Sequence, residues 1–318
     1  MKLQEIYDLA IEMGIKADPR GENSVGKILV KRRKAYEELS EKKKATFDSE
    51  TLVNPYSDSR ILFGDLQTEI TTLLAGIDSD GEEVLLADRL TQKGKRIDLV
   101  IGHHPEGHAF ANLHDVMELQ TDVYTNFGVP ENVADALMSE RMKEVERRIR
   151  PLNHNRTVDI ARLLDMPLMV LHTIWDNIGD NFMKGYLKDK SFDTVGEILE
   201  YINDIPEFVE AIKGKAAPHI VSGSVKSKPG KIGVVFTGGT NPSKELYIEW
   251  AKAGIGTIVD MHISEDALKE LKKLHVNVID CGHMAADSIG ANIFLDELEK
   301  RGVEVIACSG LIRVKRAN

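Results

Sequence analysis

The feature that most constrains the fold is a repeated alternation of short apolar runs with helical segments, from Arg60 onwards. The apolar runs of the first part are RILFGD, TTLLAGID, IDLVIG and PLMVLHT. Those of the last part are KIGVVFTGG, GTIVDMH, VNVIDCG and VEVIACS, and the segments YIEWAKAG, EDALKELKKLH and ANIFLDELEKRG separate them. Strands that alternate with helices in this way indicate an α/β fold with largely parallel strands.

The chain before these strands has a different character. Residues 1–55 are predicted to form a charged helical extension, in which Leu3, Ile6 and Ile11 share one face of a helix that Gly14 can end. The stretch KRRKAYEELSEKKK at 31–44 is typical of a solvated helix face. A nucleic-acid patch is the alternative, which the interleaved glutamates weaken.

The length of 318 residues suggests roughly two domains. We expect a first α/β lobe at 56–225, which contains a helical insertion between 113 and 164, and a second α/β lobe at 226–318. The C-terminal elements of the second lobe could also pack on the first. The best linker candidate is SGSVKSKPGK at 222–231, which is rich in small and turn-forming residues.

Composition limits the cellular compartments and the classes of binding partner that we expect. The formal net charge of −10 argues against broad nucleic-acid binding, because an acidic surface repels phosphate. Two cysteines, Cys281 and Cys308, give no disulfide framework and fit a reducing compartment. No apolar run approaches the ~20 residues that span a bilayer, and the amphipathic N-terminus is not a signal peptide. We therefore expect a cytoplasmic protein that does not enter membranes.

Two parts of the sequence echo each other. The segments TLLAGIDSDGEEVLLADRLTQKGKRIDLVIGHH and TIVDMHISEDALKELKKLHVNVIDCGH share a strand, an acidic loop, a helix and a strand that ends in Gly-His. As a pseudo-repeat, they would place His103–His104 and His283 at equivalent strand ends. The alternative is two ordinary βαβ units without a common origin.

Three segments that follow apolar strands carry candidate metal ligands. They are His103 with His104 in IGHHP, His172 with Asp176 in LHTIWDN, and His283 with Asp287 in DCGHMAAD. Adjacent histidines in a turn would suit two neighbouring ions, and a helix beginning near Met284 would bring His283 and Asp287 together. Imidazole combined with carboxylate suits Zn²⁺, Mn²⁺, Fe²⁺ or Co²⁺. The alternative is three unrelated polar strand ends.

The combination of IGHHP, LHTIWDN and DCGHMAAD, in this order, resembles the NIF-three family (Ngg-one-interacting factor three proteins). Some bacterial members are labelled type-two GTP cyclohydrolase. The resemblance extends from about Arg60 to the C-terminus, and FTGGTNPSKELYIEWAKAGIGTIVDMHISEDALKEL resembles the family's penultimate unit, which runs towards a histidine near His262. It implies two α/β lobes that face each other across a cleft with a dinuclear metal site, and subunits that assemble into a homohexamer.

By the same resemblance, the ligands of two divalent ions (Zn, Mn, Fe or Co) would be His103, His104, Asp176, His283 and Asp287, with His172 beside the site. The family usually has glutamate at the position of Asp287, and the shorter carboxylate could change the preferred metal. The N-terminal extension and the helical insertion are larger than the family pattern.

These residues favour a metal-dependent hydrolase that acts on a small molecule, such as a phosphoester or a cyclic C–N bond of a nucleotide-like ring. His172 or His108 could transfer the proton. The alternative function is a non-catalytic metal-binding or assembly protein. The FTGGTN stretch resembles a phosphate loop only loosely, because it lacks the lysine and the spacing of a P-loop.

Overall fold

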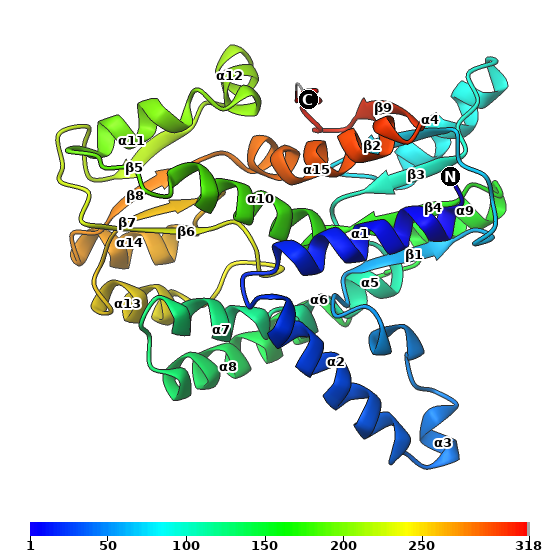
Figure 1. Cartoon of the computed structure of the whole chain (residues 1–318), viewed down its shortest axis with the longest axis horizontal. Helices are drawn as coiled ribbons and strands as arrows, with labels where there is room; N and C mark the ends of the chain where they lie inside the picture. Colours follow the sequence, from blue (N-terminus) through cyan, green and yellow to red (C-terminus); the bar gives the residue numbers. More distant parts are fainter. Residues whose placement is uncertain (317–318) are drawn as a thin grey trace.

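The computed structural model describes residues 1–316, which form two β-sheets surrounded by helices (Figure 1). The expected α/β class is confirmed. The five-stranded sheet has the order β1-β4-β3-β2-β9, and the four-stranded sheet has the order β5-β8-β7-β6. The strands of the first sheet are β1 (Ser59–Phe63), β2 (Thr72–Gly76), β3 (Leu99–Gly102), β4 (Leu168–Leu171) and β9 (Glu304–Cys308). Those of the second are β5 (His219–Ser222), β6 (Lys231–Val235), β7 (Ile255–Asp260) and β8 (Asn277–Asp280).

The two sheets share one topology. In each, the first strand along the chain is an antiparallel edge, β1 against β4 and β5 against β8, and the next neighbours are parallel. By position in the sheet, β3 therefore corresponds to β7 and β4 to β8. The pseudo-repeat considered from the sequence paired the end of β3 with the end of β8, so it is offset by one strand. It aligned the two Gly-His dipeptides, which do not occupy corresponding positions in the two sheets.

The chain passes from the first sheet to the second and back. The segment 222–231, expected to link two lobes, connects β5 to β6 inside the four-stranded sheet. After β8 the chain returns, and β9 pairs in parallel with β2 over five residue pairs. The sequence gives little sign of this, because β5 has only four residues and its first, His219, is exposed.

Two helices lie between the sheets in Figure 1, α10 (His172–Leu187) and α15 (His283–Lys300). Each begins directly after a parallel strand, β4 or β8, and they contact each other closely. Their backbones approach at Gly179 and Gly290: a Cβ at Gly290 would lie 3.0 Å from the Gly179 nitrogen and closer still to the Trp175 carbonyl. The absence of side chains at these two positions permits the close crossing.

The remaining helices cover the sheets or form the N-terminal extension. They are α1 (Leu3–Ala17), α2 (Glu22–Glu37), α3 (Glu41–Lys44), the 3-10 helix η1 (Ser49–Leu52), α4 (Gly81–Gln92), α5 (Gly107–Ala111), α6 (Leu113–Val116), α7 (Leu119–Asn126), α8 (Glu131–Ile149), α9 (Arg156–Leu163), α11 (Val195–Ile202), α12 (Pro206–Lys213), α13 (Lys244–Lys252) and α14 (Glu265–Lys273). Among residues 1–316, none of the helices has the length and apolar character needed to cross a membrane.

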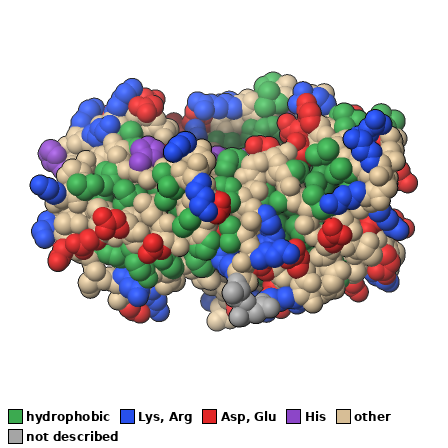
Figure 2. Space-filling model, turned by 90° about the horizontal axis from the view of Figure 1, so that it is seen from above, with side chains coloured by type: hydrophobic (Ala, Val, Ile, Leu, Met, Phe, Trp, Pro, Cys, Tyr) green, Lys and Arg blue, Asp and Glu red, His purple; other side chains and the backbone are tan. Residues whose placement is uncertain are grey.

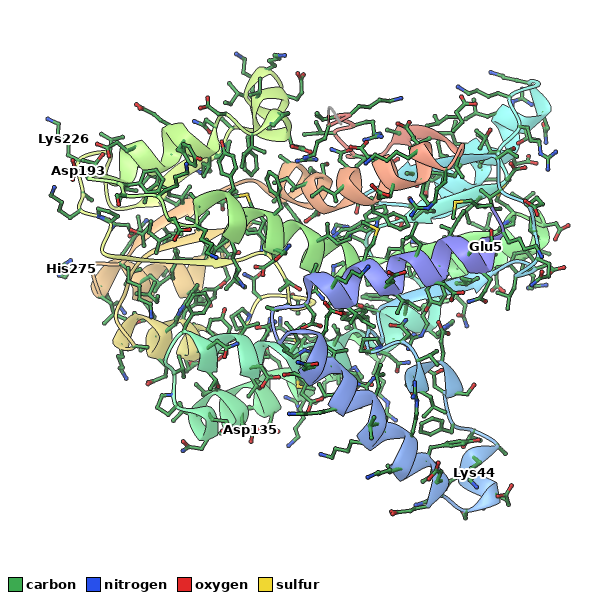
Figure 3. The ribbon with its side chains drawn as sticks, viewed as in Figure 1. Glu5, Lys44, Asp135, Asp193, Lys226 and His275 are labelled. Carbon is green, nitrogen blue, oxygen red and sulfur yellow. The ribbon has the colours of Figure 1, made fainter. Side chains whose placement is uncertain are left out.

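The N-terminal helices divide into a packed part and a projecting part. Helix α1 packs on α10 through a buried face, whereas α2 leads away from the body to α3, and Lys44 lies at the far end of this arm (Figures 1 and 3). The expectation that Gly14 ends the first helix is wrong. Gly14 lies inside α1, where a Cβ would be 3.1 Å from side-chain carbons of both Ile174 and Tyr56, so the glycine serves close packing.

Candidate metal centre

The candidate ligands leave the two sheets at three strand ends. His103 and His104 follow β3, while His172 and His283 are the first residues of α10 and α15. One helical turn later, Asp176 and Asp287 lie on the same helix faces as His172 and His283. The same His-x-x-x-Asp arrangement thus occurs at the start of both central helices, at corresponding places in the two topologies.

The structure brings all five predicted ligands together. His103 Nε2 lies 3.3 Å from Asp176 Oδ1 and 3.7 Å from Asp287 Oδ1. The other oxygen of Asp287, Oδ2, lies 3.2 Å from His283 Nε2 and 3.6 Å from His104 Nε2. The Nε2 atoms of His104 and His283 are 3.3 Å apart. Asp287 therefore presents one carboxylate oxygen to each of two groups of side chains.

Hydrogen bonds hold the outer nitrogens of these imidazoles. His104 Nδ1 donates to Asp78 Oδ1 at 2.6 Å, and His103 Nδ1 is 3.4 Å from the Leu171 carbonyl. His172 Nδ1 donates to Asp58 Oδ2 at 2.8 Å. Carboxylate or carbonyl partners of this kind orient metal-binding histidines and fix the tautomer, so that the opposite nitrogen is free to bind.

Several buried polar atoms that face this point have no hydrogen-bond partner among the described residues. They are His103 Nε2, Asp176 Oδ1, and both carboxylate oxygens of Asp287. Unsatisfied buried polar atoms are costly, and buried carboxylates normally pair or bind a cation. Ligand atoms within 4.8 Å of one another form three groups: His103, His104 and His172; His104, His283 and Asp287; and His103, Asp176 and Asp287. These residues could hold a metal ion, and their donor set suits a transition metal or zinc.

The acid–base properties of the cluster are also those of a cation site. Burial raises the pKa of Asp176 to about 7 and raises that of Asp287 well above its ordinary value. Burial, assisted by neighbouring imidazoles, lowers the pKa of His103 and brings that of His283 to about 3. His103 and His283 are therefore neutral and able to donate a lone pair, while burial outweighs the charge that neighbouring His172 contributes to the two carboxyl groups.

The cluster lies in a pocket of about 370 Å³ whose lining comes from both sheets. Figure 2 shows a hollow at the upper edge of the molecule, on a face where acidic and basic side chains are interspersed. On the side of the second sheet, the wall is the loop 237–242. Gln120 Nε2 donates to the carbonyls of Gly238 and Thr240 in this loop, both at 2.6 Å, and Thr237 Oγ1 donates to Asn177 Oδ1 at 2.6 Å. The loop is thereby fixed to α7 and α10.

Comparisons with known proteins show which solved structures share this architecture. No family model matches the sequence, and no curated protein matches it. Among solved structures, the chain is similar to a NIF3 superfamily protein from Sphaerobacter thermophilus, with 29% sequence identity and a TM-score of 0.71. The match covers 80% of this chain and 92% of that chain. The chain thus resembles the NIF3 superfamily in both fold and sequence.

Two further solved structures are less similar. Reduced HcgD from Methanocaldococcus jannaschii has 14% identity and a TM-score of 0.49, with 78% of this chain and 87% of that chain covered. A Bacillus cereus protein related to NIF3 has 10% identity and a TM-score of 0.43, with 79% and 91% covered. The predicted family resemblance is confirmed by the Sphaerobacter match.

In this NIF3-like chain, the two histidines predicted to transfer protons have different surroundings. His172 is buried beside the cluster; burial opposes its charge, but Asp176 and the hydrogen bond to Asp58 raise its pKa to about 9. His108 is exposed on α5 and is not among the residues that line the pocket. The charges that act on it are those of Arg60, Glu50 and Asp48. The structure therefore brings His172 to the cluster and leaves His108 outside it.

The sequence interpretation missed two carboxylates that hold histidines of the cluster, Asp58 and Asp78. It also gave no role to His262. Asp58, which precedes β1, binds His172, and nothing in the stretch PYSDSR signals this contact. Asp78 follows β2 as a polar strand end, which was the available signal for its bond to His104. His262 follows β7, and its ring centroid lies 4.4 Å from that of His283. Its position after β7 corresponds to that of the histidine pair after β3.

Proposed function

We propose that this chain binds two divalent metal ions and uses them to hydrolyse a small molecule. The observation that carries the proposal is the orientation of Asp287, whose two oxygens face different groups of ligand atoms. His103 and Asp176 would complete one group, and His104 and His283 the other. If both groups held an ion, Asp287 would supply one carboxylate oxygen to each group.

The chemistry follows from the ligands and their neighbours. Divalent ions supply Lewis acidity, which polarises a substrate oxygen and makes water a nucleophile near neutral pH. His172 keeps its Nδ1 on Asp58, so that Nε2 can hold or release a proton at the edge of the cluster. The loop 237–242 closes the opposite wall, and the buried position of the cluster restricts access of bulk water. A phosphoester or a cyclic C–N bond is the class of substrate that this arrangement suits.

Metal binding tests the first part of the proposal. The protein should be stripped with a chelator, reloaded separately with Zn²⁺, Mn²⁺ and Fe²⁺, and assayed by elemental analysis and isothermal titration calorimetry. We expect about two ions per chain in the parent and a loss of at least one in His103→Ala. His219→Ala, which removes an exposed histidine from β5, is the matched control and should bind as the parent does. Absence of metal after all three reconstitutions would contradict the proposal.

Turnover tests the second part. The reloaded protein should hydrolyse at least one member of a panel of phosphoesters and cyclic purine derivatives, and His103→Ala and His172→Ala should abolish this activity. If two ions bind but no member of the panel is hydrolysed, the alternative function is favoured, in which the protein binds metal or a partner without catalysis. Metal content is measured independently of activity, so these outcomes can be distinguished.

A further inference from the structure

The pocket around the metal centre has an unusual charge. Besides the ligand carboxylates, its lining contains four acidic side chains: Asp78, Asp80, Glu106 and Asp260. None of the lining residues in the part of the chain that the structure describes is lysine or arginine. Sites that bind nucleotide phosphates normally supply lysine, arginine or a helix N-terminus for the charge of each phosphate. In this pocket, α10 and α15 begin with residues of the candidate metal centre, and α4 and α5 begin after the acidic N-cap residues Asp80 and Glu106. Its positive charge is therefore concentrated where metal ions would bind.

Basic side chains near the pocket are directed elsewhere. Arg141 lies behind the loop 237–242, where its Nε donates to the Asn241 carbonyl at 3.1 Å, and its Nη1 forms an ion pair with Glu144 at 2.7 Å. Lys184 is paired with the buried Asp180 at 2.6 Å. Neither residue lines the pocket. An anionic ligand would therefore find no lysine or arginine on the described wall, and the protonated His172 lies at the metal centre, where it is paired with Asp58.

The remaining lining is apolar or neutral. Phe110 and Leu113 lie on the side of the first sheet, and Phe236, Met261 and Tyr247 on the side of the second. Tyr247 is itself held by a hydrogen bond from its hydroxyl group to Asp260 Oδ2 at 2.7 Å. Apolar and aromatic side chains of this kind line most pockets for small organic ligands, so this wall suits an apolar body.

From this distribution we infer that the substrate carries a single anionic group, which the metal centre takes, on an apolar body that is otherwise neutral or positively charged. Polyanions such as nucleoside triphosphates are excluded. The inference rests on the proposed metal centre. Asp176 and Asp287 balance half of the charge of two divalent ions, and the remaining charge of +2 is matched by one dianionic group such as a phosphonate. A second anionic group would meet Asp80 and Glu106 on the wall, whereas an ammonium group there would be attracted.

Three matched probes test the inference in the metal-loaded protein. They are benzylphosphonate, its 4-carboxy derivative and its 4-aminomethyl derivative, which differ only in the charge opposite the phosphonate. By calorimetry at low salt, we expect the carboxy probe to bind at least about tenfold more weakly than the parent compound, and the aminomethyl probe at least as tightly. Pyrophosphate and triphosphate serve as polyanions, and triphosphate should bind more weakly than the monophosphonate.

Two double variants test whether the carboxylates of the pocket wall cause the preference among the probes. Burial raises the pKa of Glu106 to about 7, so the probes are compared at pH 8, where Asp80→Asn with Glu106→Gln removes two charges from the wall. Asparagine keeps a side chain suited to begin α4. In this double variant, the binding affinities of the carboxy and aminomethyl probes should differ by less than about threefold. Glu82→Gln with Asp88→Asn removes the same charge from α4 outside the pocket lining, and it should leave the difference unchanged.

The outcomes separate this inference from the proposed function. Equal or tighter binding of the carboxy probe, a selectivity that the wall variants do not alter, or no binding of any probe at millimolar concentration would each overturn the inference. Metal binding and turnover could still be found in those cases. Conversely, charge selectivity without hydrolysis of any substrate would uphold the inference for a metal-dependent binding pocket and reject catalysis.

Discussion

Asp287 can be assigned either to a metal site or to the start of a helix, and the structure separates the two roles. A capping carboxylate accepts hydrogen bonds from backbone N–H groups in the first turn. Asp287 follows the first turn of α15, is buried, and neither of its oxygens accepts a hydrogen bond from the described residues. Asp287→Asn should therefore lower metal affinity at least about tenfold while the free energy of unfolding changes by less than ~1 kcal/mol.

Calorimetric metal titration and chemical denaturation of the same variant check this prediction. Asp287→Glu supplies the control, because it keeps the charge and introduces the residue that the family resemblance expects at this position. It should retain metal, with a changed preference among Zn²⁺, Mn²⁺ and Fe²⁺. Unchanged metal affinity in Asp287→Asn would remove Asp287 from the ligand set.

Asp260 should make stability depend on pH. Burial raises its pKa from 3.8 to about 7, although hydrogen bonds from Tyr247 and the backbone oppose this. Between these two values the folded state holds a proton that the unfolded state releases, so stability is lost as the pH rises towards 7. In denaturation experiments at pH 5.5 and pH 8, Asp260→Asn should lose less stability than the parent, by on the order of 2 kcal/mol.

The matched control for Asp260 is Asp266→Asn, which alters an exposed carboxylate on α14. This variant should show the pH dependence of the parent. If Asp260→Asn also follows the parent curve, the carboxyl group of Asp260 is charged in the folded protein at pH 5.5 and the prediction is wrong.

The sequence indicated the residues of the cluster better than the carboxylates that hydrogen-bond to its histidines. Histidines at the ends of apolar strands are visible as a pattern, because strand ends converge at one edge of a parallel sheet. The partners Asp58 and Asp78 come from other strands, and only the three-dimensional pairing of β1 with β4 and of β2 with β3 brings them near His172 and His104. His108 shows the opposite case, since its distance along the chain from His104 is short but its helix carries it to another surface.

Among the elements, the crossing of α10 and α15 determines the distance between the two His-x-x-x-Asp pairs. A side chain at Gly290 would collide with the Trp175 carbonyl, one residue before Asp176. Gly290→Ala should therefore destabilise the fold by roughly 1–3 kcal/mol or more and weaken metal binding as well. Gly185→Ala on the same α10 is the control: nothing lies within 4 Å of the added carbon, so stability should rise by up to ~1 kcal/mol.

Thermal denaturation and metal titration of both glycine variants give the measurement. A Gly290→Ala protein with parental stability and metal content would show that the helices can separate without cost, and that their contact does not position the ligands.

The elements themselves were largely visible in the sequence, whereas their arrangement was not. Strands such as β3 and β7 and helices such as α4 and α14 follow from apolar periodicity. The correspondence of β3 with β7 could not be seen, because hydrogen-bonded order in a sheet leaves no local pattern. Gly14 was misinterpreted for a similar reason: a glycine needed for contact with a distant helix has the same appearance in a sequence as one that ends its own helix.

At the scale of the whole molecule, we predict a homo-oligomer, with six chains as the expected number. The prediction derives from the family resemblance, which implies a hexameric ring. Size-exclusion chromatography with multi-angle light scattering at micromolar concentration should give six times the mass of one chain, in 0.15 M salt and in 0.5 M salt. The mass of a single chain under both conditions would contradict it.

The return of β9 to the first sheet has a consequence for how the protein is made. The exposed edge of β2 stays without its neighbour until residue 308 has left the ribosome, although β2, β3 and β4 are complete more than a hundred residues earlier. Domains that fold during synthesis usually close one after the other. Here the five-stranded sheet cannot be completed until β9 has been synthesised, and until then the edge of β2 can pair with other nascent chains. A chaperone that binds and shields this edge should therefore raise the yield of folded protein.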